Sequence, residues 1–222
     1  MEPIDFIAIG FWIAGSVLAI AVALFLLKKY YDSDERNRVK LAFSLIFLTL
    51  GISRLLLMYF DYFLTGLNPA LYTNYQFYWR IATLFQLIGL GFLILVSEYA
   101  VFQGKDYYLF FIGFLIILIV GMAVQDFVLS QNIVVYAVVF AAFIPISWIY
   151  LAWKLPLARK NTVLIIVGFL IFGFGLILLS INIVEMLAPI MDIHTDYLLA
   201  AIIQIPGLLL FAWGIKRYYF VS

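Results

Sequence analysis

Long apolar stretches separated by short polar connections make up most of the chain. Seven such runs can be delimited, at roughly 4–27, 41–64, 77–102, 107–124, 132–153, 163–187 and 197–215. Each has about 18 residues or more, which is the length a helix needs to cross the hydrocarbon core of a bilayer. A bilayer offers an open backbone no hydrogen-bond partners, so each run is expected to be helical. The pattern predicts an all-α membrane protein, a seven-transmembrane-helix bundle that forms a single domain over residues 1–222.

Basic residues lie almost entirely on one side of this arrangement. The connections after the first, third and fifth runs and the C-terminal tail hold all but two of the 13 lysines and arginines, namely Lys28, Lys29, Arg36, Arg38, Lys40, Lys105, Lys154, Arg159, Lys160, Lys216 and Arg217. The other two, Arg54 and Arg80, lie inside runs. The positive-inside rule therefore places the N-terminus outside and the C-terminus in the cytosol. We expect a multi-pass integral protein of the cell membrane.

Composition narrows the partners that the chain can have. The sequence is 67% hydrophobic and 11% charged, and its short connections leave no room for a soluble domain. A net charge of +1 argues against nucleic acid as a partner, whereas the basic connections suit anionic lipid headgroups. Cysteine is absent. The start of the chain is acidic, with Glu2 and Asp5, so the first run is expected to be a retained anchor rather than a cleaved signal peptide.

Two short matches raise the hypothesis of an internal repeat with a 3+1+3 arrangement. Residues 86–90 in the third run and 204–208 in the seventh both read Gln-x-x-Gly-Leu. Gly51 and Gly175 are each followed ten residues later by a carboxylate. Such a parallel repeat occurs in some transporters. The alternative is coincidence, because apolar helices draw on few residue types.

Polar side chains inside the runs are concentrated in the half that we place toward the outside. With a rise of about 1.5 Å per residue, Arg54 falls roughly 15 Å deep, near the midplane, Gln86 roughly 14 Å and Gln204 roughly 10 Å deep, and the others lie nearer the outer surface. We take these residues as a candidate outward-facing ligand-binding site: Arg54, Asp61, Arg80, Gln86, Asn182, Glu185 and Gln204. Glu98 is the exception, because it lies near the inner face, where Lys105 or a basic loop offers a partner.

Arg54 is the central residue of this candidate site. A charged side chain at the bilayer centre costs about 3 kcal/mol or more, so it needs a partner or a purpose. Asp61 shares its helix face, but helical side chains lean toward the helix N-terminus, and we expect the two not to touch. A guanidinium with the amides of Gln86 and Gln204 nearby suits bidentate binding of a carboxylate or phosphate. The competing interpretation is that Arg54 and Arg80 pair with acidic residues and only hold helices together.

The last outer connection contains Asp192, His194 and Asp196 at alternate positions. This spacing is compatible with a divalent ion, but three ligands in an unsupported loop make a weak site. We interpret the segment as an ordinary solvated loop and predict no metal site.

Catalytic motifs are absent from the sequence. The runs contain no lysine that could carry a retinal, and the single histidine cannot supply two axial ligands to a haem. Zinc-protease, nucleophile-elbow and phosphate-loop motifs are also missing. We therefore expect neither an enzyme nor a cofactor.

Three functions remain compatible with the sequence. The first is a receptor-like protein that binds a small anionic or zwitterionic ligand, or a lipid headgroup, from the outside and signals through a separate protein partner. The second is a small solute carrier with a site at the midplane. The third is a non-catalytic structural or accessory subunit of a membrane complex.

Overall fold

The computed structural model describes residues 1–32, 38–103, 105, 108–179 and 181–219, and its regular structure is helical throughout these residues. The α-helices are α1 (Pro3–Tyr31), α2 (Arg38–Met58), α3 (Gln76–Phe102), α4 (Leu109–Ala123), α5 (Phe127–Ala141), α6 (Phe143–Lys154), α7 (Arg159–Leu178), α8 (Ile181–Leu187) and α9 (Ile193–Tyr219). Shorter helical segments are the π-helix η1 (Tyr59–Leu64) and the 3-10 helices η2 (Pro69–Tyr75) and η3 (Pro156–Ala158).

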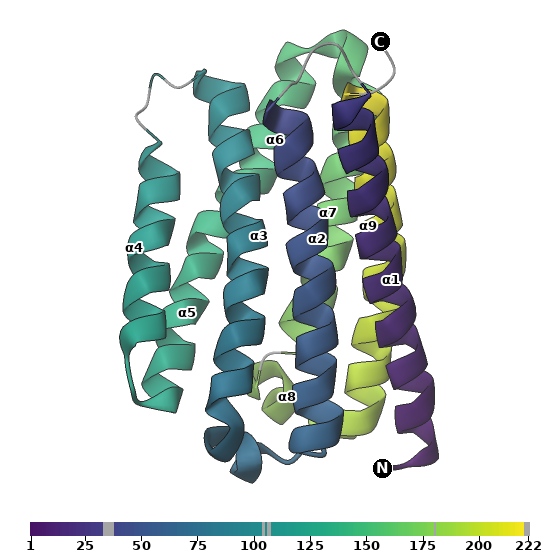
Figure 1. Cartoon of the computed structure of the whole chain (residues 1–222), viewed down its shortest axis with the longest axis vertical. Helices are drawn as coiled ribbons and strands as arrows, with labels where there is room; N and C mark the ends of the chain where they lie inside the picture. The colour runs from purple at the N-terminus through teal and green to yellow at the C-terminus, as the bar shows by residue number, and fades with distance from the viewer. Residues whose placement is uncertain (33–37, 104, 106–107, 180, 220–222) are drawn as a thin grey trace.

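The long helices form a bundle of two layers (Figure 1). Helices α4, α3, α2 and α1 lie in the front layer of this view, and α5, α6, α7 and α9 lie behind them. Each of these helices packs against its neighbours in the sequence, and contact between α1 and α9 closes the bundle. Helix α1 begins at one end of the bundle and α9 finishes at the opposite end.

Six helical stretches in the described part of the chain are long and apolar enough to cross a membrane. They are Pro3–Tyr31, Arg38–Leu64, Pro69–Phe102, Phe127–Lys154, Pro156–Leu178 and Ile193–Arg217. Helix α4 is apolar but has only 15 residues, a length of about 22 Å. That is less than the roughly 30 Å hydrocarbon thickness. The expected helical, multi-pass membrane protein is thus confirmed, while the crossing by the fourth run, and with it the count of seven, stays a prediction.

Two runs that we expected to be continuous helices are divided. Helix α5 ends at Ala141, four residues before Pro145, and α6 begins at Phe143. Pro145 has no backbone N–H to donate to the carbonyl oxygen of Ala141, and its ring crowds that oxygen. Run six is also split, into α7 and the short α8. Pro206, in contrast, lies within the continuous helix α9.

Glycines set the distance between α7 and α9, which pack against each other along most of their length. A Cβ added to Gly168 would lie 2.7 Å from the Cα of Phe211 and 2.8 Å from the carbonyl oxygen of Gly207. A Cβ on Gly207 would lie 2.9 Å from the Cα of Phe172. Only glycine at these positions lets the two backbones touch, as small residues do in membrane helix pairs.

Glu98 joins α3 to the start of α4. Its side chain is fully buried, and its two carboxylate oxygens accept hydrogen bonds from the backbone N–H groups of Phe110 (2.7 Å) and Phe111 (2.9 Å). Those amides belong to the first turn of α4 and have no partner within the helix. This carboxylate thus caps the neighbouring helix α4, a role that the sequence alone does not reveal.

Candidate ligand site at Arg54

Arg54 lies inside the bundle with 6% of its surface exposed. Its guanidinium carbon lies 5.5 Å from the ring centre of Trp12 on α1 and 5.8 Å from that of Phe172 on α7. Its Nη2 donates a hydrogen bond of 3.4 Å to Oε1 of Gln86 on α3. Among the described side chains, no carboxylate forms an ion pair with Arg54, and its Nε–H is buried without a partner. Two aromatic faces and one long hydrogen bond are weak compensation for a buried charge.

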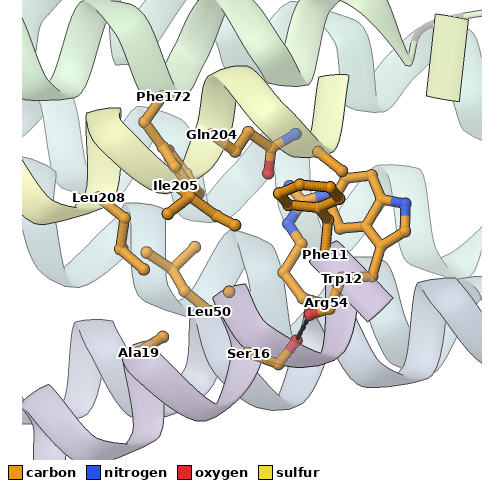
Figure 2. Close-up of a pocket in the computed structure, with 12 residues that line it drawn as sticks. Phe11, Trp12, Ser16, Ala19, Leu50, Arg54, Phe172, Gln204, Ile205 and Leu208 are labelled. Atoms are coloured by element: carbon orange, nitrogen blue, oxygen red, sulfur yellow. Dashed lines mark hydrogen bonds between the residues drawn. The ribbon is translucent and has the colours of Figure 1, made fainter. Parts of the chain in front are cut away.

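A small pocket lies beside this guanidinium (Figure 2). Its volume, measured as the space open to the centre of a water molecule, is about 20 Å³. Four helices, α1, α2, α7 and α9, provide the lining residues: Phe11, Trp12, Gly15, Ser16, Ala19, Leu50, Arg54, Phe172, Ala201, Gln204, Ile205 and Leu208. One water molecule needs roughly 10–15 Å³ by this measure. The pocket therefore admits a water or one small polar group.

Gln204 supplies a second unsatisfied donor to the pocket. Its side chain is 4% exposed, and its Nε2 has no hydrogen-bond partner in the described structure. The amide group lies at the same end of the pocket as the Arg54 guanidinium. A buried donor left without a partner costs about 1–3 kcal/mol. Two such donors from different helices make this pocket suited to an acceptor, either water or the oxygen of an anion.

The pocket is partly open, and its more exposed lining residues are Phe11 and Gly15 on α1 and Ile205 on α9, so we place the opening between these two helices. Phe11, on the outward side of α1, is 37% exposed and lines the pocket. A Cβ added to Gly15 would lie 3.5 Å from Cγ1 of Ile205, so the two helices come close below Phe11. The exposed side chains of both helices around this opening are apolar, as expected of a surface in contact with lipid.

Asp61 belongs to a separate group of hydroxyls. It lies in η1, and its Oδ1 accepts a hydrogen bond of 3.5 Å from the hydroxyl of Tyr197. That hydroxyl lies 3.4 Å from the hydroxyl of Tyr72. The backbone carbonyl of Asp61 accepts from the Thr65 hydroxyl at 3.0 Å. As expected from the direction of helical side chains, Arg54 and Asp61 form no ion pair.

Arg80 has a structural role away from the pocket. Its Nη1 donates to the carbonyl oxygen of Met122 at 2.9 Å, and its Nη2 donates to that of Gln125 at 3.1 Å. Met122 lies in the last turn of α4, where carbonyls lack partners within the helix, and Gln125 follows that turn. Nη2 also lies 3.2 Å from Oε1 of Gln76. Arg80 therefore holds α3 against the end of α4 through neutral acceptors rather than through the carboxylates we had considered.

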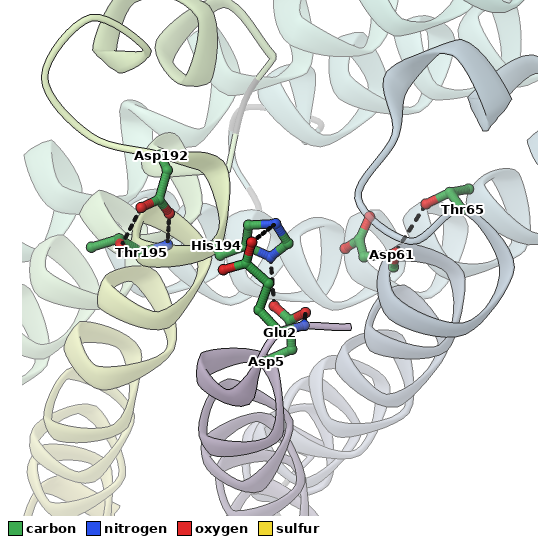
Figure 3. A network of polar contacts seen from close by, with 7 residues as sticks. All are labelled: Glu2, Asp5, Asp61, Thr65, Asp192, His194 and Thr195. Carbon is green, nitrogen blue, oxygen red and sulfur yellow. Dashed lines mark hydrogen bonds and ion pairs between the residues drawn. The ribbon is translucent and has the colours of Figure 1, made fainter.

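The end of the bundle at which α1 begins contains a carboxylate–histidine contact that ties α1 to α9 (Figure 3). His194 Nδ1 lies 2.7 Å from Oδ1 of Asp5, which is buried, and His194 Nε2 lies 3.8 Å from Oε1 of Glu2. The backbone N–H of Glu2 donates to Asp5 at 2.6 Å. The segment that we interpreted as a solvated loop is thus the start of α9, and the described acidic and histidine residues form no metal-binding group.

Asp192 and Asp196, which flank this contact, differ in their surroundings. Asp192 precedes α9 and accepts hydrogen bonds from the backbone N–H of Thr195 (2.7 Å) and from its hydroxyl (3.1 Å). The backbone hydrogen bond lowers the pKa of this exposed carboxyl below its ordinary value. Asp196 is 1% exposed, and neither of its carboxylate oxygens has a partner in the described part of the chain.

The structure therefore brings three of the seven candidate residues together: Arg54, Gln86 and Gln204. Asn182 and Glu185 lie in α8, but their side chains are outside the described residues. Sequence reasoning missed Trp12 and Phe172, because aromatic residues in apolar runs look like ordinary packing. It also missed the burial of Asp196, although Asp196, Ala200 and Gln204 follow one another at four-residue steps and so share a face of α9.

The chain was compared with known protein families, curated proteins and solved structures. No protein family, no curated protein and no solved structure matches the chain.

Proposed function

We propose that this chain is a receptor-like membrane protein that binds a small anionic group at Arg54 and signals through a separate protein partner. One observation carries the proposal: Arg54 and Gln204 line the same pocket, and each has a buried N–H group without a hydrogen-bond partner in the described structure. A charge-assisted hydrogen bond to an ionised oxygen is roughly twice as strong as a neutral one. An anionic oxygen would therefore satisfy both donors and neutralise the buried charge.

The contrast with Arg80 supports a binding role over a purely structural one. Arg80 reaches three oxygen acceptors at distances between 2.9 and 3.2 Å, and it is only half-buried. Arg54 is more deeply buried, yet it has one acceptor at 3.4 Å and an unpaired Nε. A residue kept only to hold helices together is expected to have its donors satisfied, as those of Arg80 are. The incomplete shell of Arg54 favours a ligand.

The arrangement of helices around the pocket offers a route for the signal. Arg54 belongs to α2 and Gln204 to α9, so a shared ligand would draw these helices together. Helix α9 continues to its basic end at Lys216 and Arg217. A ligand that favours one placement of α9 shifts the equilibrium between two states of the bundle. We propose that a cytosolic partner, or one within the membrane, reads this shift.

We also propose that the chain crosses the membrane seven times, with its N-terminus outside. The opposite ends of α1 and α9 support an odd number of crossings. Basic residues terminate α1 and α9 at the end that we assign to the cytosol. Helix α4 is then the short crossing, which local thinning of the bilayer around it would accommodate.

Thermal unfolding of the purified protein with soluble monoanions tests the binding role. Acetate, butyrate and phosphate would each be titrated at constant ionic strength, with tryptophan fluorescence as the readout. A ligand at 100 times its dissociation constant stabilises by about 2.7 kcal/mol. We expect at least one of these anions to raise the midpoint of the wild type and of Arg80→Gln, but not that of Arg54→Gln. If Arg54→Gln responds as the wild type does, or if none of the three anions acts on the wild type, binding of a soluble anion at the proposed site is refuted.

A further inference from the structure

The pocket is too small to contain more than the polar end of a ligand. Its volume of about 20 Å³ fits one water-sized group beside Arg54 and Gln204. The rest of any organic ligand must lie outside, along the opening between Phe11 on α1 and Ile205 on α9. That path is apolar and faces the hydrocarbon of the bilayer. A ligand with a very small charged end and an apolar remainder fits both parts of the site.

The depth of the pocket in the bilayer favours some classes of amphiphilic ligand over others. Trp12 lies roughly 14 Å along α1 from its start at Pro3. That depth is close to the midplane, since the hydrocarbon core is about 30 Å thick. The Arg54 guanidinium that stacks on Trp12 is therefore well below the level of lipid headgroups. A phosphodiester keeps its charge while it sinks to this level, whereas a carboxylic acid can enter in its neutral, protonated form.

The unpaired cationic donor beside the pocket favours a small ionised acceptor. Nε of Arg54 and Nε2 of Gln204 are unpaired, while Nη2 of Arg54 already faces Gln86. A carboxylate is planar and smaller than a phosphate, and one negative charge balances the single cation. We infer that the ligand of Arg54 is a long-chain monocarboxylate, a fatty acid, that enters laterally from the bilayer between α1 and α9. This inference rests on the proposed function and names the class of its ligand.

The path is narrowest beside Gly15, and this allows a variant that blocks it and a matched control. Gly15 lies where α1 approaches Ile205, so Gly15→Leu should close the path without adding charge. Gly10 lies on the same helix, and a Cβ there meets nothing within 4 Å. Gly10→Leu is therefore the matched control, with the same gain in volume and apolar surface on α1.

The experiment measures equilibrium binding of radiolabelled palmitate to the full chain in nanodiscs of zwitterionic lipid. We expect saturable binding of one palmitate per chain, at least tenfold weaker in Arg54→Gln and in Gly15→Leu, and unchanged in Gly10→Leu. Hexadecanol, which has the same chain without the carboxylate, should not compete. A diazirine-bearing palmitate should crosslink to peptides of α1 and α9 in the wild type, a readout that does not depend on how the variants fold.

Several results would overturn the inference. Equal binding by Gly15→Leu and Gly10→Leu would refute the lateral path, and competition by hexadecanol would refute the role of the carboxylate. Displacement of palmitate by phosphatidylglycerol at equal concentration would assign the site to a phospholipid headgroup instead. If soluble butyrate acts through Arg54 and palmitate binds no more tightly, the proposed function stands and the fatty-acid inference fails. If neither acid depends on Arg54, both fail.

Discussion

The contact between α7 and α9 allows a quantitative test of the fold around the pocket. A Cβ at Gly168 would lie 2.7 Å from the Cα of Phe211, and ordinary contact of a Cβ begins near 3.4 Å. The helices would have to separate by more than the 0.7 Å difference between these distances, because the backbone nitrogen of Phe211 lies closer still and backbone atoms cannot swing aside as a flexible side chain can. Overpacking of this kind costs about 1–3 kcal/mol, and we expect Gly168→Ala to fall at the upper end.

Gly173 on the same helix provides the control, since a Cβ there meets nothing within 4 Å. Gly173→Ala adds the same methyl group to α7 and should be neutral or more stable by up to about 1 kcal/mol, because alanine favours the helix. The two variants should therefore differ by about 3 kcal/mol or more in the free energy of unfolding. Reversible unfolding in mixed micelles, followed by circular dichroism, measures this difference. A difference below about 0.5 kcal/mol would show that α7 and α9 are not in backbone contact at Gly168.

Other predictions concern the polar contacts and the topology. Arg80→Ala should lower the free energy of unfolding by about 1–2 kcal/mol, since it removes the hydrogen bonds to the end of α4, and it should leave palmitate binding intact. A loss of binding equal to that of Arg54→Gln would contradict the separation of the two arginines. The pKa of Asp192 is lowered in the folded state. Its contribution to the free energy of unfolding should therefore be complete above the ordinary pKa of 3.8 and be lost as the pH falls below that value. Asp192→Asn should therefore cost less than about 1 kcal/mol at pH 7 and nothing at pH 2, and an equal cost at both pH values would refute the cap. The chain has no cysteine, so single cysteines can report on its orientation. In intact cells an impermeant maleimide should label Asn74→Cys but not Lys160→Cys, and the reverse pattern would invert the proposed topology.

Much of the architecture follows from the apolar pattern, because a span of hydrocarbon leaves the backbone few options. The apolar pattern did not predict every helix boundary, and particular residues show why. The apolar pattern of the fifth run continues through Pro145, so it could not show that the helix would end at Ala141, four residues before this proline. The start of α9 was missed because Asp192, His194 and Asp196 are residue types that are common in loops. In the structure Asp192 caps the helix, His194 contacts Asp5 on α1, and Asp196 is buried.

The candidate site was only partly predictable for a related reason. The depth of each polar residue along its helix can be counted from the sequence, and this count placed Arg54, Gln86 and Gln204 at similar levels. Rotation of each helix about its axis depends on packing, which no count provides. Arg80 was at an outer level too, yet its side chain turns toward the end of α4. The rings of Trp12 and Phe172 could be identified as neighbours of Arg54 only once the contacts of α1 and α7 were known.

The closure of the bundle by α1 and α9 has a consequence for biogenesis. Among the described helices, α1 leaves the ribosome first and α9 last. Arg54 therefore enters the membrane on α2 well before Phe172 and Gln204 have been made. Until α7 brings Phe172 and α9 brings Gln204, a nascent chain must keep this cation in hydrocarbon or in the insertion machinery with Trp12 and Gln86 as its described neighbours. The pocket comes into being with the final helix, so the ability to bind there is also a sign that synthesis and assembly of these helices are complete.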